Sequence, residues 1–244
     1  SRFAGYAYCK AHASVYGRLA WINARLKSRY PCAFYAALLN LHKSMYPPRV
    51  FVWDAMRKGI PVFPPDVNYS SNGWKYGSNG IQAGINLVKG VRAVLCRELV
   101  HERKQNGPFR NLQELLQRVR FHRGEVERLI IAGACRSIGE REELLKESQI
   151  TDKAGRQLGF FEPEVQGLPP LSECEERFIG IPFTRHPVTY FPRGICKAVD
   201  MRKHIRENVT MIGIMDTCKE TNTGRHGSGK NAIMVDHPRI FGIT

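Results

Sequence analysis

A lysine and a histidine near the amino terminus carry side chains that could hold phosphate. Lys10 and His12 stand two residues apart. Apolar residues then recur at three- and four-residue steps, at Val15, Leu19, Ile22 and Leu26. That spacing predicts an amphipathic helix over residues 12–29. Cations beside the free N–H groups of a helix start can bind phosphate oxygens through charge and hydrogen bonds. A solvated helix start is the simpler interpretation of the same residues.

A short segment in the middle of the chain could hold DNA by its backbone. Residues 85–92 read Ile-Asn-Leu-Val-Lys-Gly-Val-Arg. A glycine in a hairpin between two short helices lets backbone N–H groups approach a phosphate without contact to the bases. The candidate DNA contacts are Lys89, Gly90, Val91 and Arg92. Because helix packing of any kind also uses glycine, this hairpin by itself does not decide between DNA binding and simple packing.

A third candidate site is a peptide in a stretch rich in Gly, Pro and polar residues. Gln157, Leu158, Phe160 and Phe161 lie within residues 151–170, where the composition predicts a linker. An exposed peptide with an amide and two aromatic rings can lodge in a preformed pocket of a partner protein. Packing of the same rings within the linker is the alternative.

The composition narrows the class of protein. Hydrophobic residues make up 43% of the chain and charged residues 24%, which indicates a folded protein rather than a disordered one. The formal charge of +15 favours a polyanionic partner, nucleic acid before others, although an alkaline or ribosome-like protein would share it. Seven widely spaced cysteines without zinc-type spacing indicate reduced thiols and a cytoplasmic protein. No apolar run predicts a membrane span.

The elements that must position these candidates are mostly helical. Two further helices are expected, from Phe34 and from Pro48, followed by an extended segment at 60–65. Residues 72–86 are rich in Gly and Asn, so we expect no core element there and a domain boundary near Gly80. Short helices with glycine turns should fill 87–139. A β-rich segment at 209–215 is expected to pair with 232–235 as a hairpin.

The order of these segments resembles the alpha subunit of bacterial DNA polymerase III, a C-family DNA polymerase. Residues 5–12, 30–40, 57–60 and 64–68 are similar to the family's fingers region, whose pattern includes Y-P-A-x-F-x-A-A-L-L and later P-P-D-V-N. The resemblance implies that the fingers grip the incoming nucleotide and that Lys10 and His12 lie near its triphosphate. It covers about residues 3–218.

The resemblance also implies roles for the later segments. Residues 85–92 are similar to the family's first helix-hairpin-helix unit and residues 126–139 to its second, with Gly133 as a DNA contact. The peptide Gln-Leu-Gly-Phe-Phe at 157–161 is similar to the family's sliding-clamp motif, Q-L-S/D-L-F. Residues 176–187 resemble the segment before the family's OB domain, where a structural role is expected for His186.

These inferences give a mainly α fold followed by a partial β OB-fold. The expected parts are the end of the fingers (1–80), tandem helix-hairpin-helix (81–150), a linker with the clamp motif (151–172), and a pre-OB segment with an incomplete OB-fold (173–244). The resemblance implies duplex and single-stranded DNA, an incoming dNTP, the sliding clamp and other replicase subunits as partners, and no membrane.

The family's palm motif of closely spaced Asp residues is not found in the sequence. Since those carboxylates hold two Mg²⁺ ions in the parent polymerase, we expect no catalytic residue, metal site or cofactor in this chain, and no polymerase activity from it alone. The first residue is not Met, which favours a part of a longer protein. Two alternatives stay open: a free-standing, non-catalytic DNA-binding adaptor, and the family's error-prone relative used in DNA repair.

Overall fold

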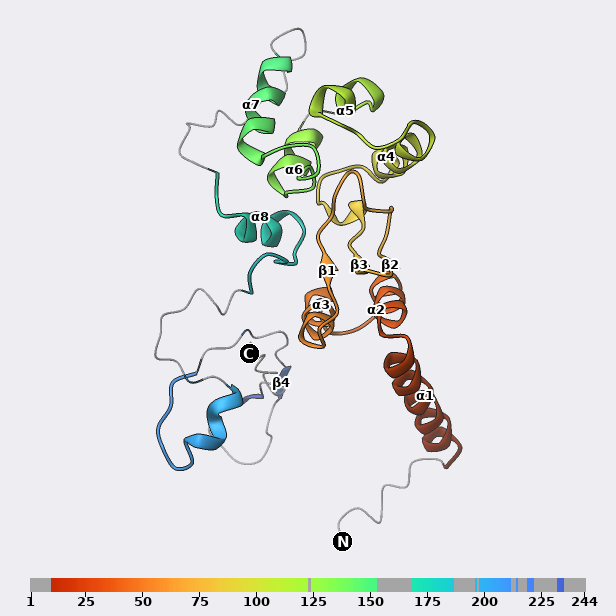
Figure 1. The fold of residues 1–244 in the computed structure, drawn as a ribbon. Helices are drawn as coiled ribbons and strands as arrows, with labels where there is room; N and C mark the ends of the chain where they lie inside the picture. The colour runs from red at the N-terminus through yellow and green to blue at the C-terminus, as the bar shows by residue number, and fades with distance from the viewer. Residues whose placement is uncertain are drawn as a thin grey trace.

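The computed structural model describes residues 10–122, 124–152, 168–186, 196, 198–211, 214, 219–221 and 232–234 (Figure 1). Three helices come first: α1 (Lys10–Arg29), α2 (Pro31–Asn40) and α3 (Pro48–Arg57). The three expected helices are thereby confirmed. Pro31 and Pro48 stand at the first turns of α2 and α3, where the missing proline N–H leaves no intrahelical bond unmade.

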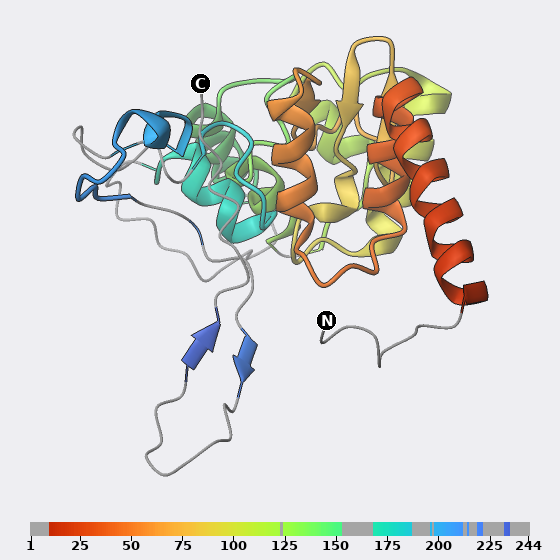
Figure 2. The ribbon, with the colours of Figure 1, turned by 90° about the horizontal axis from the view of Figure 1, so that it is seen from below.

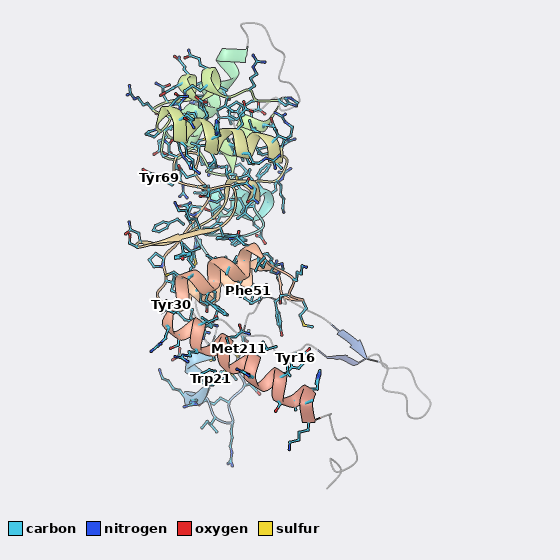
Figure 3. The ribbon with its side chains drawn as sticks, turned by 90° about the vertical axis from the view of Figure 1, so that its right-hand side faces the viewer. Tyr16, Trp21, Tyr30, Phe51, Tyr69 and Met211 are labelled. Atoms are coloured by element: carbon cyan, nitrogen blue, oxygen red, sulfur yellow. The ribbon has the colours of Figure 1, made fainter. Side chains whose placement is uncertain are left out.

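Helix α1 projects from the rest of the protein. None of its residues is buried. Among the described elements, it packs mainly against α2. Figures 1 and 2 show α1 on one side of α2 and α3, with α8 (Leu171–Phe178) on the other side. The aromatic side chains of Tyr16 and Trp21 stand out from the exposed helix (Figure 3).

A small sheet follows α3 and corrects the expectation for residues 72–86. Strands β1 (Val62–Phe63), β2 (Lys75–Gly77) and β3 (Gly80–Gln82) form a sheet in the order β1-β3-β2, with β3 parallel to β1 and antiparallel to β2. The prediction that this stretch contains no core element was wrong. Ile81 of β3, Ala83 after it and Ile85 of η1 (Ile85–Leu87) are all buried, so this stretch contributes to the core.

Short helices joined by glycine turns make up the next part, as expected. They are the 3-10 helix η1 (Ile85–Leu87) and helices α4 (Ala93–Asn106), α5 (Leu112–Arg118), α6 (Glu125–Ile131) and α7 (Arg141–Asp152). Helix α5 shows why such a short helix forms. The Asn111 side chain accepts a hydrogen bond from the Glu114 N–H (2.8 Å), and the Glu114 carboxylate accepts one from the Arg110 N–H (2.9 Å), so two backbone N–H groups at the helix start are satisfied.

The last part of the chain contains less regular structure in its described residues. The 3-10 helix η3 spans Ala198–Lys203, and β4 (Lys219–Thr221) pairs antiparallel with β5 (Ala232–Met234). The second strand of the expected hairpin is therefore confirmed, but its partner is β4. Val209, Thr210, Met211 and Ile214, from the expected first strand, are not in a strand. One two-stranded pairing does not confirm the expected OB-fold.

One buried cluster runs through most of the described chain. It includes Tyr35 of α2, Ile81 of β3, Leu129 of α6 and Ile181 after α8, all less than a tenth exposed. Gly80, near the expected boundary, lies within β3 and is buried. The packing thus continues across this position, and the family's domain divisions stay a prediction.

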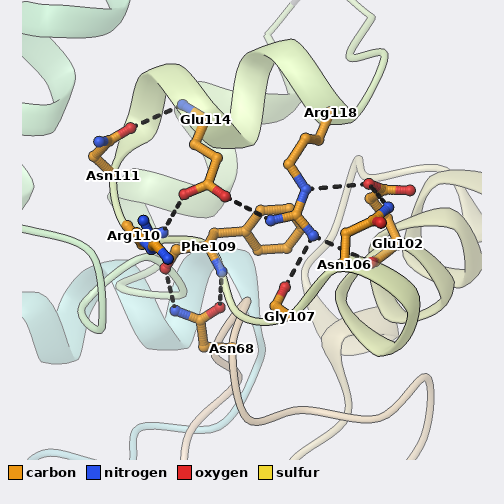
Figure 4. A network of polar contacts seen from close by, with 9 residues as sticks. All are labelled: Asn68, Glu102, Asn106, Gly107, Phe109, Arg110, Asn111, Glu114 and Arg118. Carbon is orange, nitrogen blue, oxygen red and sulfur yellow. Dashed lines mark hydrogen bonds and ion pairs between the residues drawn. The ribbon is translucent and has the colours of Figure 1, made fainter.

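The segment between β1 and β2 ties the first helices to the later ones. The Asn68 amide donates to the Phe109 carbonyl and accepts from the Phe109 N–H, both at 2.8 Å (Figure 4). The Arg118 guanidinium lies over the Phe109 ring, 4.4 Å from its centroid, and donates to the Gly107 carbonyl at 2.9 Å. This arrangement fixes the turn between α4 and α5.

We expect Asn68→Ala to lower the free energy of unfolding by about 1–3 kcal/mol, because both polar backbone groups of Phe109 would lose their partner in a partly buried place. Urea unfolding followed by circular dichroism measures the change. Asn106→Ala is the matched control, since the Asn106 amide makes an exposed bond to Glu102 only. Its effect should stay within about 0.5 kcal/mol. Equal losses in the two variants would contradict the structural role of Asn68.

Candidate nucleic-acid interface

The two residues predicted to hold nucleotide lie at the exposed start of α1. Lys10 begins the helix, and the His12 ring lies 4.4 Å from the Tyr16 ring, centroid to centroid. Both side chains are exposed. The structure does not bring them near the first hairpin. That hairpin contacts α8, whereas α1 lies on the side of α2 and α3 that is opposite to α8 (Figure 2). Nucleotide binding by this pair stays a prediction.

A buried carboxylate anchors the other end of α1. Asp54 of α3 accepts hydrogen bonds from Lys27 (2.8 Å), from Arg57 (2.7 Å) and from the Tyr35 hydroxyl. Burial alone would raise the pKa of Asp54, but the hydrogen bonds from Lys27, Tyr35 and Arg57 outweigh it and hold this pKa well below its usual 3.8. Burial and the bond to Asp54 raise the pKa of Tyr35 to about 12. The aspartate therefore stays ionised and holds α1 in place.

The first hairpin has the geometry that its sequence predicted. Gly90 has φ +79°, a left-handed conformation that favours glycine. The hairpin closes through a bond from the Val91 N–H to the Val88 carbonyl (3.3 Å), and the Lys89 N–H donates to the Phe178 carbonyl of α8 (2.7 Å). Among the described residues, none accepts a hydrogen bond from the Gly90 N–H. Residue 92 has φ −66°, so a residue with a side chain adopts this conformation without backbone strain.

Arg92 serves a structural purpose within the hairpin. Its guanidinium binds both carboxylate oxygens of Glu125 at 2.9 Å, and its backbone N–H donates to the same carboxylate at 2.9 Å. Glu125 is buried, which alone would raise its pKa, but the bonds from Arg92 and from the His122 N–H lower the pKa overall. The charge of Arg92 is thus compensated inside the protein. Its predicted contact with DNA is not tested.

Gly133 ends α6 and lies against α8. Its φ is +77°, and its N–H donates to the Ile130 carbonyl at 2.9 Å, as at many glycine-terminated helices. A Cβ atom at this position would come within 2.8 Å of the Leu171 side chain. The geometry therefore explains this glycine by helix termination and close packing. DNA contact by Gly133 stays a prediction.

Two arginines at the first hairpin were not singled out by sequence analysis. Arg128 of α6 donates from its guanidinium to the Gly90 carbonyl at 2.9 Å, and Arg177 of α8 accepts a bond from the Lys89 ammonium with its backbone carbonyl at 3.3 Å. Both lie outside residues 85–92: Arg128 is in the second predicted unit (126–139) and Arg177 in the segment 176–187, so the glycine motif of the first hairpin did not reveal them. The sequence feature that could have identified them is the presence of basic residues on the short helices next to the hairpins.

The remaining candidates have mixed outcomes. The clamp motif, Gln157, Leu158, Phe160 and Phe161, lies outside the described residues. The His186 ring packs on the Trp53 ring, 4.3 Å between centroids, which fits the structural role expected for it. Cys32, Cys96, Cys135 and Cys174 form no disulfide, and burial raises the pKa of Cys96, Cys135 and Cys174. No helix within the described ranges is both long and apolar enough to span a bilayer.

The fold and the hairpin identify a helix-hairpin-helix region in this chain. Residues 59–144 match the family model described as a helix-hairpin-helix motif, which includes both hairpins and the helices between them. The chain is moreover a relative of one region of the alpha subunits of bacterial DNA polymerase III, as the similarities to individual proteins show. The family predicted from the sequence is thereby confirmed.

The similarity extends over much of this chain but over a small part of each relative. A DNA polymerase III subunit alpha of Thermus aquaticus is 32% identical over 231 residues, which cover 84% of this chain and 19% of the relative. The subunit of Chlamydia muridarum is 35% identical, with 54% and 11% covered. An error-prone DNA polymerase of Rhodopirellula baltica is 28% identical, with 85% and 20% covered. The chain therefore spans about a fifth or less of the length of these relatives.

We expect the stabilising effect of Asp54 to depend on pH. A carboxylate whose pKa is lower in the folded state contributes stability above its unfolded value near 3.8, and that stability is lost as the pH falls through the folded value. At pH 6, Asp54→Asn should lower the free energy of unfolding by about 1.5–3 kcal/mol, the usual range for hydrogen bonds to a charged group. At pH 2.5 the difference from the wild-type chain should be smaller.

Urea unfolding at the two pH values measures this difference. Glu207→Gln is the control, because Glu207 forms an exposed pair with His204 and should change stability little at either pH. A loss from Asp54→Asn that is equal at pH 6 and pH 2.5 would show that the ionised carboxylate does not anchor α1.

Proposed function

We propose that this chain binds duplex DNA through the sugar-phosphate backbone, as a DNA-holding part of a bacterial replicative polymerase. The observation that carries the proposal is the first hairpin: Gly90 at φ +79°, a backbone N–H without a described acceptor, and Lys89 next to it. The match to a helix-hairpin-helix motif and the polymerase relatives support the same function.

The chemistry of the hairpin favours phosphate over bases. A backbone N–H and an ammonium group can donate to any phosphate oxygen, and neither distinguishes one base pair from another. The formal charge of +15 would draw the chain toward DNA over a Debye length of about 10 Å at 0.1 M salt. Binding should therefore depend on salt far more than on sequence.

Helix α1 extends the proposal to the nucleotide and the single strand. It carries cations along its length and exposes Tyr16 and Trp21, and the Arg25 guanidinium lies 5.3 Å from the centroid of the Trp21 ring. Such a face suits phosphates and unstacked bases. In the parent polymerase, Lys10 and His12 would then hold the triphosphate, with Mg²⁺ bound by carboxylates outside this chain. The main replicative and the error-prone enzyme both fit this proposal, and so does an adaptor.

We expect the chain to bind double-stranded DNA of any sequence, with log affinity falling linearly with log salt. Lys89→Gln should reduce the slope by about 0.9, the value for one lost phosphate contact, and weaken all sequences alike. Glutamine is preferred to glutamate here, because Lys89 faces the Arg177 carbonyl at the end of α8 and a carboxylate would be repelled by it.

Fluorescence anisotropy with two unrelated duplexes measures the affinity and its salt dependence. The titrations should run from about 50 to about 200 mM salt. Lys58→Gln is the matched control, since Lys58 is an exposed lysine at the end of α3. Binding that does not change with salt, or a strong preference for one duplex, would contradict backbone recognition.

A second part of the proposal is tethering to the sliding clamp by the peptide at 157–161. The sequence motif alone supports this part. Its two adjacent aromatic side chains lie in a polar stretch, and burying them in a partner would be favourable. Replacing Phe160 and Phe161 by Ala should lower affinity for the cognate clamp by about 2 kcal/mol or more, as expected for anchor residues. DNA binding should not change.

Calorimetric titration of the clamp with wild-type and double-alanine protein measures the loss. Leu168→Ala, in the same polar stretch but outside the motif, is a suitable control. If both proteins bind the clamp equally and the double variant unfolds at a lower temperature, the rings pack within the chain instead.

A further inference from the structure

Three residues with cationic side chains, from separate parts of the chain, lie in or contact the first hairpin. Lys89 belongs to the hairpin itself, Arg128 to α6 and Arg177 to α8. All three residues are exposed, and none forms an ion pair with a carboxylate in the described part of the chain. Other cations of the fold differ: Lys27, Arg92 and Arg118 each pair with a carboxylate at 2.8–3.1 Å.

The Arg128 guanidinium lies directly on Gly90. One of its nitrogens donates to the Gly90 carbonyl at 2.9 Å. A Cβ atom at Gly90 would stand 2.9 Å from the Cδ and Nε atoms of Arg128 and 3.0 Å from Cζ. A side chain at residue 90 would therefore require the Arg128 side chain to move. A guanidinium has five N–H donors, and one contact to Gly90 leaves the others available.

Helix α8, which carries Arg177, contacts the first hairpin at its C-terminal end. Its last carbonyls bind Lys89: the Phe178 carbonyl accepts from the Lys89 N–H at 2.7 Å, and the Arg177 carbonyl accepts from the Lys89 ammonium at 3.3 Å. The Arg177 guanidinium lies 5.5 Å from the centroid of the Phe178 ring, which keeps it near the end of the helix. Arg177 and Lys89 are thus neighbours although 88 residues separate them.

We infer that Arg128 and Arg177 complete a phosphate-binding site at the first hairpin, and that its ligand is a backbone phosphate diester of DNA. The inference rests on the proposed DNA binding and adds the residues that carry it. The Gly90 N–H and the guanidinium groups supply donors of the kind that grip phosphate oxygens, with arginine able to bind two oxygens at once. Because Arg177 comes from α8, the site is complete only when α8 is docked on the hairpin.

The chain offers a test that separates this inference from the proposed function. Arg128→Gln and Arg177→Gln should each weaken duplex binding and reduce the salt slope by about 0.9, and the double variant should reduce it by about twice that amount. Arg128→Lys should keep the slope but bind more weakly than wild type, because it keeps the charge and loses the fork. Arg202→Gln on η3, an exposed arginine remote in the chain, is the matched control.

Anisotropy titrations over a series of salt concentrations give the slopes, and urea unfolding of each variant shows that it is folded. Wild-type binding with unchanged slopes in both glutamine variants would overturn the inference and leave the proposed function in place. A slope reduced as much by Arg202→Gln would also overturn it, since the effect would then follow net charge alone. Absence of binding by the wild-type chain would instead refute the proposed function.

Discussion

The carboxylate of Asp66 holds together the two parts on which the candidate site depends. It accepts bonds from the Asn68 N–H (2.8 Å) and from the Ser137 hydroxyl (2.7 Å), and so joins the segment after β1 to the turns after α6. The adjacent Val67 N–H donates to the Ala134 carbonyl at 2.8 Å, and Arg103 of α4 donates to the Val67 carbonyl at 2.6 Å. Since Asp66 and Val67 are buried, leaving their polar groups without hydrogen bonds would be costly. The first helices and the hairpin helices are therefore held in one arrangement.

The distribution of cations follows from the same rule of buried charge. A carboxylate removed from water needs partners that donate hydrogen bonds. Asp54 accepts bonds from Lys27 and Arg57, and Glu125 accepts bonds from Arg92. Cations used in this way stabilise the fold and contribute less to the field outside. Those left without a described carboxylate around Gly90 contribute fully to it. The formal charge of +15 does not indicate where DNA would bind. The position of the cations without a described carboxylate partner indicates it better.

Much of the fold could be predicted from local patterns, while the site depends on contacts between distant segments. The helices followed from apolar spacing and from Pro31 and Pro48, and the Gly90 turn from its glycine. The small sheet was missed because its strands are three residues or shorter and its flanks are rich in Gly and Asn. The role of Arg92 depends on Glu125, 33 residues later, and no local pattern indicates that pair.

Helix α8 shows why the hairpin should be viewed as part of a larger unit. The expected division placed it with a pre-OB segment, yet Cys174 and Glu175 are buried, and α8 packs on α6. Glu175 binds the N–H groups of Phe183 (2.7 Å) and Thr184 (2.8 Å), which fixes the chain that follows. That chain returns to α3, where His186 meets Trp53. Because its last carbonyls bind Lys89, any movement of α8 would change both the hairpin and the cations around it. Backbone recognition of DNA would then depend on a helix outside the glycine motif.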